Sequence, residues 1–306
     1  MTKRNLTLGT ASGRLGSVVY FRRRGQQIAR VLVSVVNDRR STAQCRQRAR
    51  FANSVALWRL LRPYVGLSWR GVSRHGAPEN AFYHHNRGFM PTASRNMSRA
   101  GYAFPCLGII SYGSLSVNVP ITARQVIGTG AYKGILSFSI LTDITIPESL
   151  DVFTLFNIIR SSSQGVEHSD IIHIVAMAYG AADSLIHAVS AAEQYAPKVY
   201  HVALDDSTPN VPLSAAAPWL RCAPAATSDD EPALGMGLQP SWFPPEPDDG
   251  FVDYVLALFV ERPSNPSHSR FSRSRFLGNS DVLSTLSNLC KATPIADLFA
   301  ETFRNV

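Results

Sequence analysis

Cysteine is scarce in this 306-residue chain, and no two cysteines stand close together. The four residues occur singly, as Cys45, Cys106, Cys222 and Cys290. No Cys-x-x-Cys pair is present, so the spacing indicates neither a zinc ribbon, a redox motif nor a disulfide framework. We therefore expect buried thiols in a protein kept in a reducing compartment.

Long apolar runs are also missing. The longest apolar stretches, 171–179 and 254–260, are far shorter than the roughly 20 residues that cross a bilayer. The opening residues Met1-Thr-Lys-Arg-Asn5 lack the apolar segment of a signal peptide. We therefore expect synthesis in the cytoplasm, and we expect no association with a membrane. Charged residues make up only 17% of the chain and hydrophobic residues 45%, which excludes a largely disordered protein.

Catalytic and metal-binding motifs are absent as well. The histidines of the N-terminal third have no Cys or carboxylate at ligand spacing: His75, His84 and His85. Later histidines lie near Ser and Asp but without a Gly-x-Ser-x-Gly nucleophile motif: His173, His187 and His201. The sequence therefore predicts a protein that is not an enzyme and has no catalytic residues, metal or other cofactor.

The charge is distributed unevenly along the chain. Residues 1–100 hold 19 Lys or Arg against Asp38 and Glu79, a net +17, whereas residues 101–306 hold 11 basic and 20 acidic residues, a net −9. Eighteen of the 19 are Arg, whose planar guanidinium matches phosphate with two hydrogen bonds. This predicts a basic arm over 1–100 for nucleic acid or another polyanion. The alternative is a solvated basic face, or arginines paired with the acidic remainder.

Two β-type runs, Val18–Phe21 and Gln27–Val36, flank the segment Arg22-Arg-Arg-Gly25. A glycine-containing turn between two such runs is typical of a β-hairpin. The sequence therefore predicts an N-terminal hairpin with Arg22, Arg23 and Arg24 at its tip.

An arginine-rich helix is predicted to follow. Ser41 is a suitable N-cap, Gln44 completes a capping-box pattern, and Pro63 ends the run. Phe51, Val55 and Trp58 recur at helical spacing and predict the buried face.

The arginines of these elements are the predicted nucleic-acid contacts: Arg14, Arg22, Arg23, Arg24, Arg30, Arg39, Arg40, Arg46, Arg48 and Arg50. Arginines also alternate with aromatic residues over 69–99, a composition found both in single-strand binding by stacking and in loops packed on a domain.

The chain beyond residue 100 has short β-type runs separated by Gly, Pro, Ser and Asp: 107–110, 115–119, 135–141, 152–159, 171–179, 199–204 and 251–260. Short runs with local turns favour an antiparallel β-sandwich over a parallel sheet with long helices. Residues 205–250 are rich in Pro and acidic residues and predict an irregular excursion, and 280–303 predicts short C-terminal helices. The predicted fold is mainly β, with the basic arm at 1–100 and the sandwich-like domain at 101–306.

Several of these segments together resemble a known protein group. The opening ones are Gly13-Arg-Leu-Gly-Ser-Val-Val-Tyr20, Arg30, Asn37, Thr42-Ala-Gln44 and Gln47-Arg-Ala-Arg-Phe51. They resemble the first module of a family of small proteins from Bacteroidetes, bacteriophages and prophages, for which no activity is established. Two shorter segments are similar to later landmarks of that group: Ile110-Ser-Tyr-Gly-Ser-Leu115, and the strand at Tyr254 followed by Ser272-Arg-Ser-Arg-Phe276.

The resemblance implies a phage-associated component of the virion. We therefore expect a bacteriophage structural protein, capsid-associated, in the portal ring or in the tail region. Its expected partners are nucleic acid, other virion proteins and further copies of itself, and it would reside in the host cytoplasm before assembly. The alternative is a nucleic-acid-binding protein that acts in the host cell.

Overall fold

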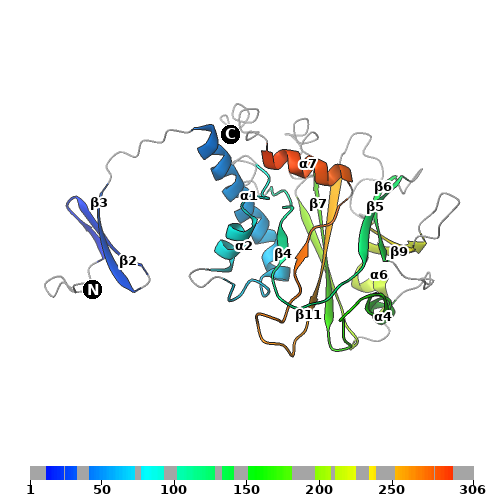
Figure 1. Cartoon of the computed structure of the whole chain (residues 1–306). Helices are drawn as coiled ribbons and strands as arrows, with labels where there is room; N and C mark the ends of the chain where they lie inside the picture. The colour runs from blue at the N-terminus through cyan, green and yellow to red at the C-terminus, as the bar shows by residue number, and fades with distance from the viewer. Residues whose placement is uncertain are drawn as a thin grey trace. The chain divides into compact units, whose positions relative to one another are not determined.

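The computed structural model describes residues 12–23, 25–32, 41–72, 77–92, 102–127, 133–140, 151–180, 197–207, 211–224, 234–238, 252–278 and 280–291. The chain divides into two compact units, unit 1 (Met1–Ser41) and unit 2 (Thr42–Val306) (Figure 1). Each unit is described by itself.

Unit 1 contains a three-stranded antiparallel sheet in the order β1-β2-β3, with β1 at Gly13–Leu15, β2 at Val18–Arg23 and β3 at Gln26–Val31. Gly16 and Gly25 have φ of 58° and 76°, the left-handed region that suits tight hairpin turns and that glycine enters without strain. The predicted hairpin is confirmed and gains a third strand. Arg22 and Arg23 belong to β2 itself, because Arg23 pairs with Gln26.

Unit 2 begins with helix α1 (Thr42–Val65), which starts directly after Ser41 as predicted. The sequence predicted that Pro63 ends the helix, but Pro63 lies inside its last turn. A proline has no backbone N–H, so it removes one helical hydrogen bond. In the last turn this loss affects only the end of the helix and leaves the preceding turns intact. The chain leaves the helix after Val65, where Gly66 N donates to Arg62 O at 3.0 Å.

The buried face of α1 differs from the predicted one. Trp58 is buried as expected, but Phe51 is 49% exposed and Val55 is half-buried. The buried stripe instead follows positions four apart: Ala49, Asn53, Leu57, Leu61 and Val65. Hydrophobicity alone misplaces this face, because the buried Asn53 is polar and is accommodated by hydrogen bonds to the backbone of Phe104.

The centre of unit 2 is an antiparallel sheet in the order β11-β7-β8, formed by β7 (Ile171–Gly180), β8 (Lys198–Leu204) and β11 (Val252–Glu261). All three strands coincide with predicted β-type runs. Strand β7 is buried on both faces, as expected for a middle strand.

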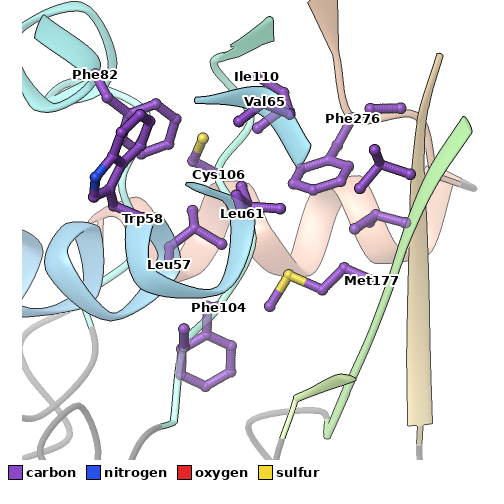
Figure 2. Close-up of a cluster of buried hydrophobic side chains, with 14 of the residues drawn as sticks. Leu57, Trp58, Leu61, Val65, Phe82, Phe104, Cys106, Ile110, Met177 and Phe276 are labelled. Atoms are coloured by element: carbon purple, nitrogen blue, oxygen red, sulfur yellow. The ribbon is translucent and has the colours of Figure 1, made fainter. Parts of the chain in front are cut away.

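Successive residues of β7 point into two different cores. Val175, Met177 and Tyr179 belong to a core with α1 and with α2 (Pro78–Asn86), part of which Figure 2 shows. Ile172 and Ile174 belong to a second core with α4 (Val152–Ser162). Helices therefore cover both faces of this sheet. The fold is mixed α/β, which corrects the prediction of a mainly β protein built as a sandwich.

Helix α4 replaces the strand predicted at 152–159. Asp151 is its N-cap, and its carboxylate accepts a hydrogen bond from Thr154 N at 2.5 Å. Hydrogen bonding to the side chain and to the backbone of Thr154 lowers the pKa of Asp151. The buried residues Val152, Leu155, Phe156 and Ile159 follow helical spacing. A short run rich in β-branched and aromatic residues fits both templates, and here the cap and the core select the helix.

The remaining elements complete the two cores and add two sheets. Strands β4 (Ile109–Ser111) and β12 (Ser274–Arg275) form a two-stranded sheet, and helix α7 (Ser280–Lys291) carries the buried Leu286 and Leu289. A four-stranded antiparallel sheet has the order β5-β6-β10-β9. Its strands are β5 (Ile121–Ile127), β6 (Lys133–Ile140), β9 (Leu220–Pro224) and β10 (Leu234–Leu238).

The segment 205–250, predicted as an irregular excursion, contributes regular structure where it is described. It includes β9, β10 and the short helix α6 (Leu213–Ala216). Of the predicted C-terminal helices, 280–291 forms α7, and 292–303 lies outside the described residues.

Candidate nucleic-acid interface

The two units differ in net charge. Residues 1–41 contain nine Lys or Arg and a single acidic residue, Asp38, a net +8. Residues 42–306 contain 21 basic and 21 acidic residues and are neutral overall. The whole net charge of the protein is therefore carried by unit 1.

The strand register of unit 1 places two arginines side by side on one face of its sheet. Arg14 on β1 and Arg30 on β3 both pair with Val19 on β2. Directly paired residues of antiparallel strands share a face, and so do residues two apart on one strand. Phe21 and Ile28, which pair with each other, are the next positions on this face, and the paired Arg23 and Gln26 follow them. We call this the basic face, and its described side chains are those of Arg14, Val19, Phe21, Gln26, Ile28 and Arg30.

Contacts within the sheet hold both arginines of the basic face. Arg14 Nε donates to Gly16 O at 3.0 Å, and the Arg30 guanidinium lies 5.5 Å from the centroid of the Phe21 ring. Both side chains are exposed. Each guanidinium therefore keeps hydrogen-bond donors available to an anion while its stem is already ordered.

The opposite face is apolar over most of its area. Leu15, Val18 and Val31 form a row across the three strands, and Tyr20 and Ala29 form the next row. Arg22, paired with Gln27, is an exposed arginine at the end of this apolar face. Arg14 and Arg30 thus share one face and Arg22 lies on the other.

The structure distributes the remaining predicted contacts between the two units. Arg23 lies in β2, and the other predicted contacts of unit 1 are outside the described residues: Arg24, Arg39 and Arg40. The predicted contacts of the arginine-rich helix lie on α1 in unit 2: Arg46, Arg48 and Arg50. Arg48 is exposed, whereas Arg46 and Arg50 are half-buried. Arg50 Nη2 donates to the carbonyl of Cys290, so this side chain joins α1 to α7.

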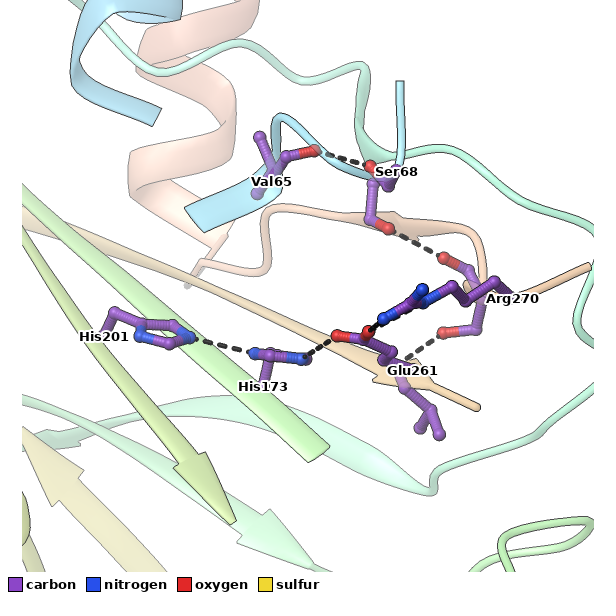
Figure 3. Close-up of polar contacts among 9 residues, drawn as sticks. Val65, Ser68, His173, His201, Glu261 and Arg270 are labelled. Carbon is purple, nitrogen blue, oxygen red and sulfur yellow. Dashed lines mark hydrogen bonds and ion pairs between the residues drawn. The ribbon is translucent and has the colours of Figure 1, made fainter. Parts of the chain in front are cut away.

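Unit 2 contains a polar array that sequence motifs did not reveal (Figure 3). His201 on β8, His173 on β7 and Glu261 on β11 lie in a diagonal row across the sheet. His173 Nδ1 lies 3.0 Å from His201 Nε2, and His173 Nε2 lies 2.9 Å from Glu261 Oε2. Arg270 pairs with the other carboxylate oxygen of Glu261. The three residues come from strands far apart in the sequence, so only the strand order could have indicated them.

The surroundings of the array set its protonation. Burial, followed by the neighbouring His173, lowers the pKa of His201 to about 4. The hydrogen bond from His173 and the pairing with Arg270 lower the pKa of Glu261. Glu261 is therefore ionised and accepts a hydrogen bond from His173 Nε2–H. This leaves His173 Nδ1 to accept a hydrogen bond from His201 Nε2–H when both rings are neutral. The array joins three strands beneath Tyr64 of α1, whose ring centroid lies 5.0 Å from that of His201.

The thiols of Cys106 and Cys290 are not activated nucleophiles. Cys106 and Cys290 are buried and free, and burial raises the pKa of Cys106 to about 12 and that of Cys290 to about 11. Across the described ranges, no three His, Cys, Asp or Glu side chains come together to hold a metal ion. Among the helices that the structure describes, none has the length and apolar character to cross a bilayer.

Comparison with protein-family models, with curated proteins and with solved structures found no match. The candidate site therefore rests on the charge, register and exposure of unit 1.

Proposed function

We propose that this protein is a non-catalytic structural component of a bacteriophage particle, in which unit 1 contacts nucleic acid and unit 2 makes the protein contacts. The observation that carries the proposal is the net positive charge of unit 1, whereas the charges of unit 2 sum to zero. A module of 41 residues with a net +8 is attached to a neutral body. A concentrated positive charge attracts polyanions, and nucleic acid is the most abundant polyanion inside a phage particle.

The packing of the two units supports this division of roles. No described residue of unit 1 is buried, and a small sheet is stabilised when its hydrophobic face packs against another surface. Contact with a partner would add such stabilisation. Unit 2 has two hydrophobic cores of its own and so has the character of a self-sufficient body.

The phage setting is supported by the resemblance of segments within 13–51 to a module of small proteins from Bacteroidetes, bacteriophages and prophages. In this setting further copies of the chain and other virion proteins are the partners of unit 2, and the virion is its final location.

Mass spectrometry of purified particles tests the structural role. We expect the chain in particles at a constant ratio to the major capsid protein, and resistant to salt washing. A chain that is abundant in infected cells but missing from purified particles would contradict the proposal and favour a nucleic-acid-binding role in the host cell.

A separate experiment tests the role of unit 1. DNA binding across a salt series is compared for the full chain, for residues 42–306, and for the full chain with Arg59→Gln and Arg62→Gln, two exposed arginines of α1. We expect the truncation to remove most of the affinity and its salt dependence, and the paired substitution to change little. Circular dichroism and thermal melting verify that the truncated chain is folded. A folded truncation with wild-type affinity would place the contact in unit 2.

A further inference from the structure

We infer that the partner of unit 1 is duplex DNA, held by its phosphate backbone on the basic face through Arg14 and Arg30. This inference rests on the proposed function, because it specifies the nucleic acid that unit 1 contacts and the face that contacts it.

The sheet of unit 1 contains no acidic residue, and Asp38 is the acidic residue of the unit. No Asp or Glu occurs between residues 12 and 32, so a complementary charge must come from elsewhere. Arg14 and Arg30 are exposed, share one face, and retain free guanidinium donors after their contacts with Gly16 and Phe21. A guanidinium binds phosphate through paired, charge-assisted hydrogen bonds.

The separation of the two arginines suits a double helix. They occupy the outer strands of the sheet with Val19 between them. Adjacent strands are about 4.8 Å apart, so the two arginine backbones are separated by roughly 10 Å. The major groove of B-DNA is about 12 Å wide and accepts β-structure. The two side chains can therefore address phosphates of both strands that border one groove.

The basic face is poorly suited to single-stranded nucleic acid. Proteins that bind single strands combine a basic groove with aromatic rings on which bases stack. On this face the aromatic residue is Phe21, and Arg30 lies over its ring. Tyr20 is on the apolar face. The other described side chains of the face are Val19, Gln26 and Ile28, and none of them is aromatic. These described side chains therefore offer cations to phosphates and no free stacking surface.

Contacts of this kind position a protein without reading its target sequence. Phosphate hydrogen bonds carry no direct base information. We therefore expect the binding to be indifferent to sequence, as a protein that contacts packaged DNA requires.

The test compares substitutions that remove equal charge from different surfaces of the full-length protein. The variants are Arg14→Gln, Arg30→Gln, their combination, Arg22→Gln on the apolar face, and Arg59→Gln with Arg62→Gln on α1. Fluorescence anisotropy measures affinity for two unrelated DNA duplexes, and for one strand of each, across a salt series. Thermal melting shows whether each variant is folded.

We expect the Arg14/Arg30 double variant to reduce the slope of log K against log salt by about 2 for both duplexes, since each lost phosphate contact removes roughly 0.9. Arg22→Gln and the α1 pair should leave the slope unchanged. Replacing Arg14 and Arg30 by Lys should retain the slope, because the charge is retained, while weakening the affinity through loss of the paired hydrogen bonds.

Three outcomes would overturn the inference of duplex DNA on the basic face. They differ in whether they also contradict the proposed contact of unit 1 with nucleic acid. A reduction by Arg22→Gln equal to that by Arg14→Gln would exclude face-specific binding. Tighter binding of single strands than of duplexes would exclude duplex DNA as the partner, while the proposed contact with nucleic acid would stand. Failure of the wild-type protein to bind any nucleic acid, with binding to polyglutamate instead, would overturn both and identify an acidic protein as the partner.

Discussion

Arg262 clamps the fully buried carboxylate of Asp170 with two parallel hydrogen bonds. Its Nε donates to Oδ1 and its Nη2 to Oδ2, each at 2.7 Å. The same guanidinium donates to the carbonyl of Gly165 and pairs with Glu167. The hydrogen bonds to Asp170, followed by the charges of Asp170 and Glu167, raise the pKa of Arg262. These contacts join the end of β11 to the turn that precedes β7.

The first prediction follows from the burial of Asp170. Replacing Arg262 by Met should lower the free energy of unfolding by about 3–5 kcal/mol, because an unpaired carboxylate would remain in the core. Lys at this position should restore only part of the loss, since its single ammonium cannot form both bonds. Urea unfolding measures the change, and Arg59→Met on the exposed surface of α1 is the control, expected to stay within about 0.5 kcal/mol. An equal effect of the two substitutions would show that the clamp contributes nothing.

A second prediction separates two aromatic residues that the sequence placed on one helical face. Trp58 is 6% exposed and packs against Phe82 at a ring centroid distance of 5.3 Å, whereas Phe51 is half-exposed. Trp58→Ala should cost about 3–5 kcal/mol in unfolding free energy. Phe51→Ala should cost about 1 kcal/mol or less, through its edge contact with Tyr83. Similar losses in the two variants would contradict the orientation of α1.

The third prediction concerns the buried Asn86, whose side-chain amide forms the pair of hydrogen bonds to a strand backbone that a neighbouring strand would otherwise form. Asn86 Oδ1 accepts from Ile109 N at 2.6 Å, and Asn86 Nδ2 donates to Ile109 O at 2.8 Å. Asn86→Leu should cost about 2–4 kcal/mol, since it leaves two buried backbone groups without partners.

The neighbouring Gly108 provides an independent check on the same contact. A Cβ at Gly108 would lie 2.0 Å from Asn86 Oδ1, whereas a Cβ at Gly88 would meet nothing within 4 Å. Thermal melting should therefore show a large loss for Gly108→Ala and a small change for Gly88→Ala. Unchanged melting of Gly108→Ala would show that the asparagine is not fixed at this position.

A fourth prediction is a loss of stability on acidification that arises in the histidine array. His201 has a pKa of about 4 in the native state against 6.5 as a free side chain, so the unfolded chain binds more protons between these values. The contribution of His201 to the free energy of unfolding is therefore fully present above pH 6.5 and is lost as the pH falls toward 4. The lowered pKa of Glu261 acts in the same direction at the acidic end.

Urea unfolding at pH 7, 5.5 and 4.5 measures this dependence. His201→Phe retains a ring beside Tyr64 but cannot titrate, so its stability should vary less with pH than that of the wild type. His268→Gln, which alters an exposed histidine, should follow the wild type. A His201→Phe curve parallel to the wild type would assign the acid sensitivity to other groups.

The sequence by itself determined the features that depend on near neighbours. Short β-type runs bounded by turn residues placed β2, β3, β7, β8 and β11, and Ser41 marked the start of α1. The concentration of arginine in the first residues follows from composition alone. These signals are local, because backbone propensity, capping and turn geometry act over a few residues.

Only the tertiary structure decided the rest. The segment 152–162 became helical because Asp151 caps it and the second core buries its apolar stripe, although its composition also suits a strand. The buried face of α1 depends on hydrogen bonds between the Asn53 side chain and the backbone N–H and C=O of Phe104, 51 residues away. His173, His201 and Glu261 met because β7 lies between β8 and β11, and Arg14 joined Arg30 through the register with Val19. Strand order and register are chosen by the packing of residues distant in the sequence, so no local pattern encodes them.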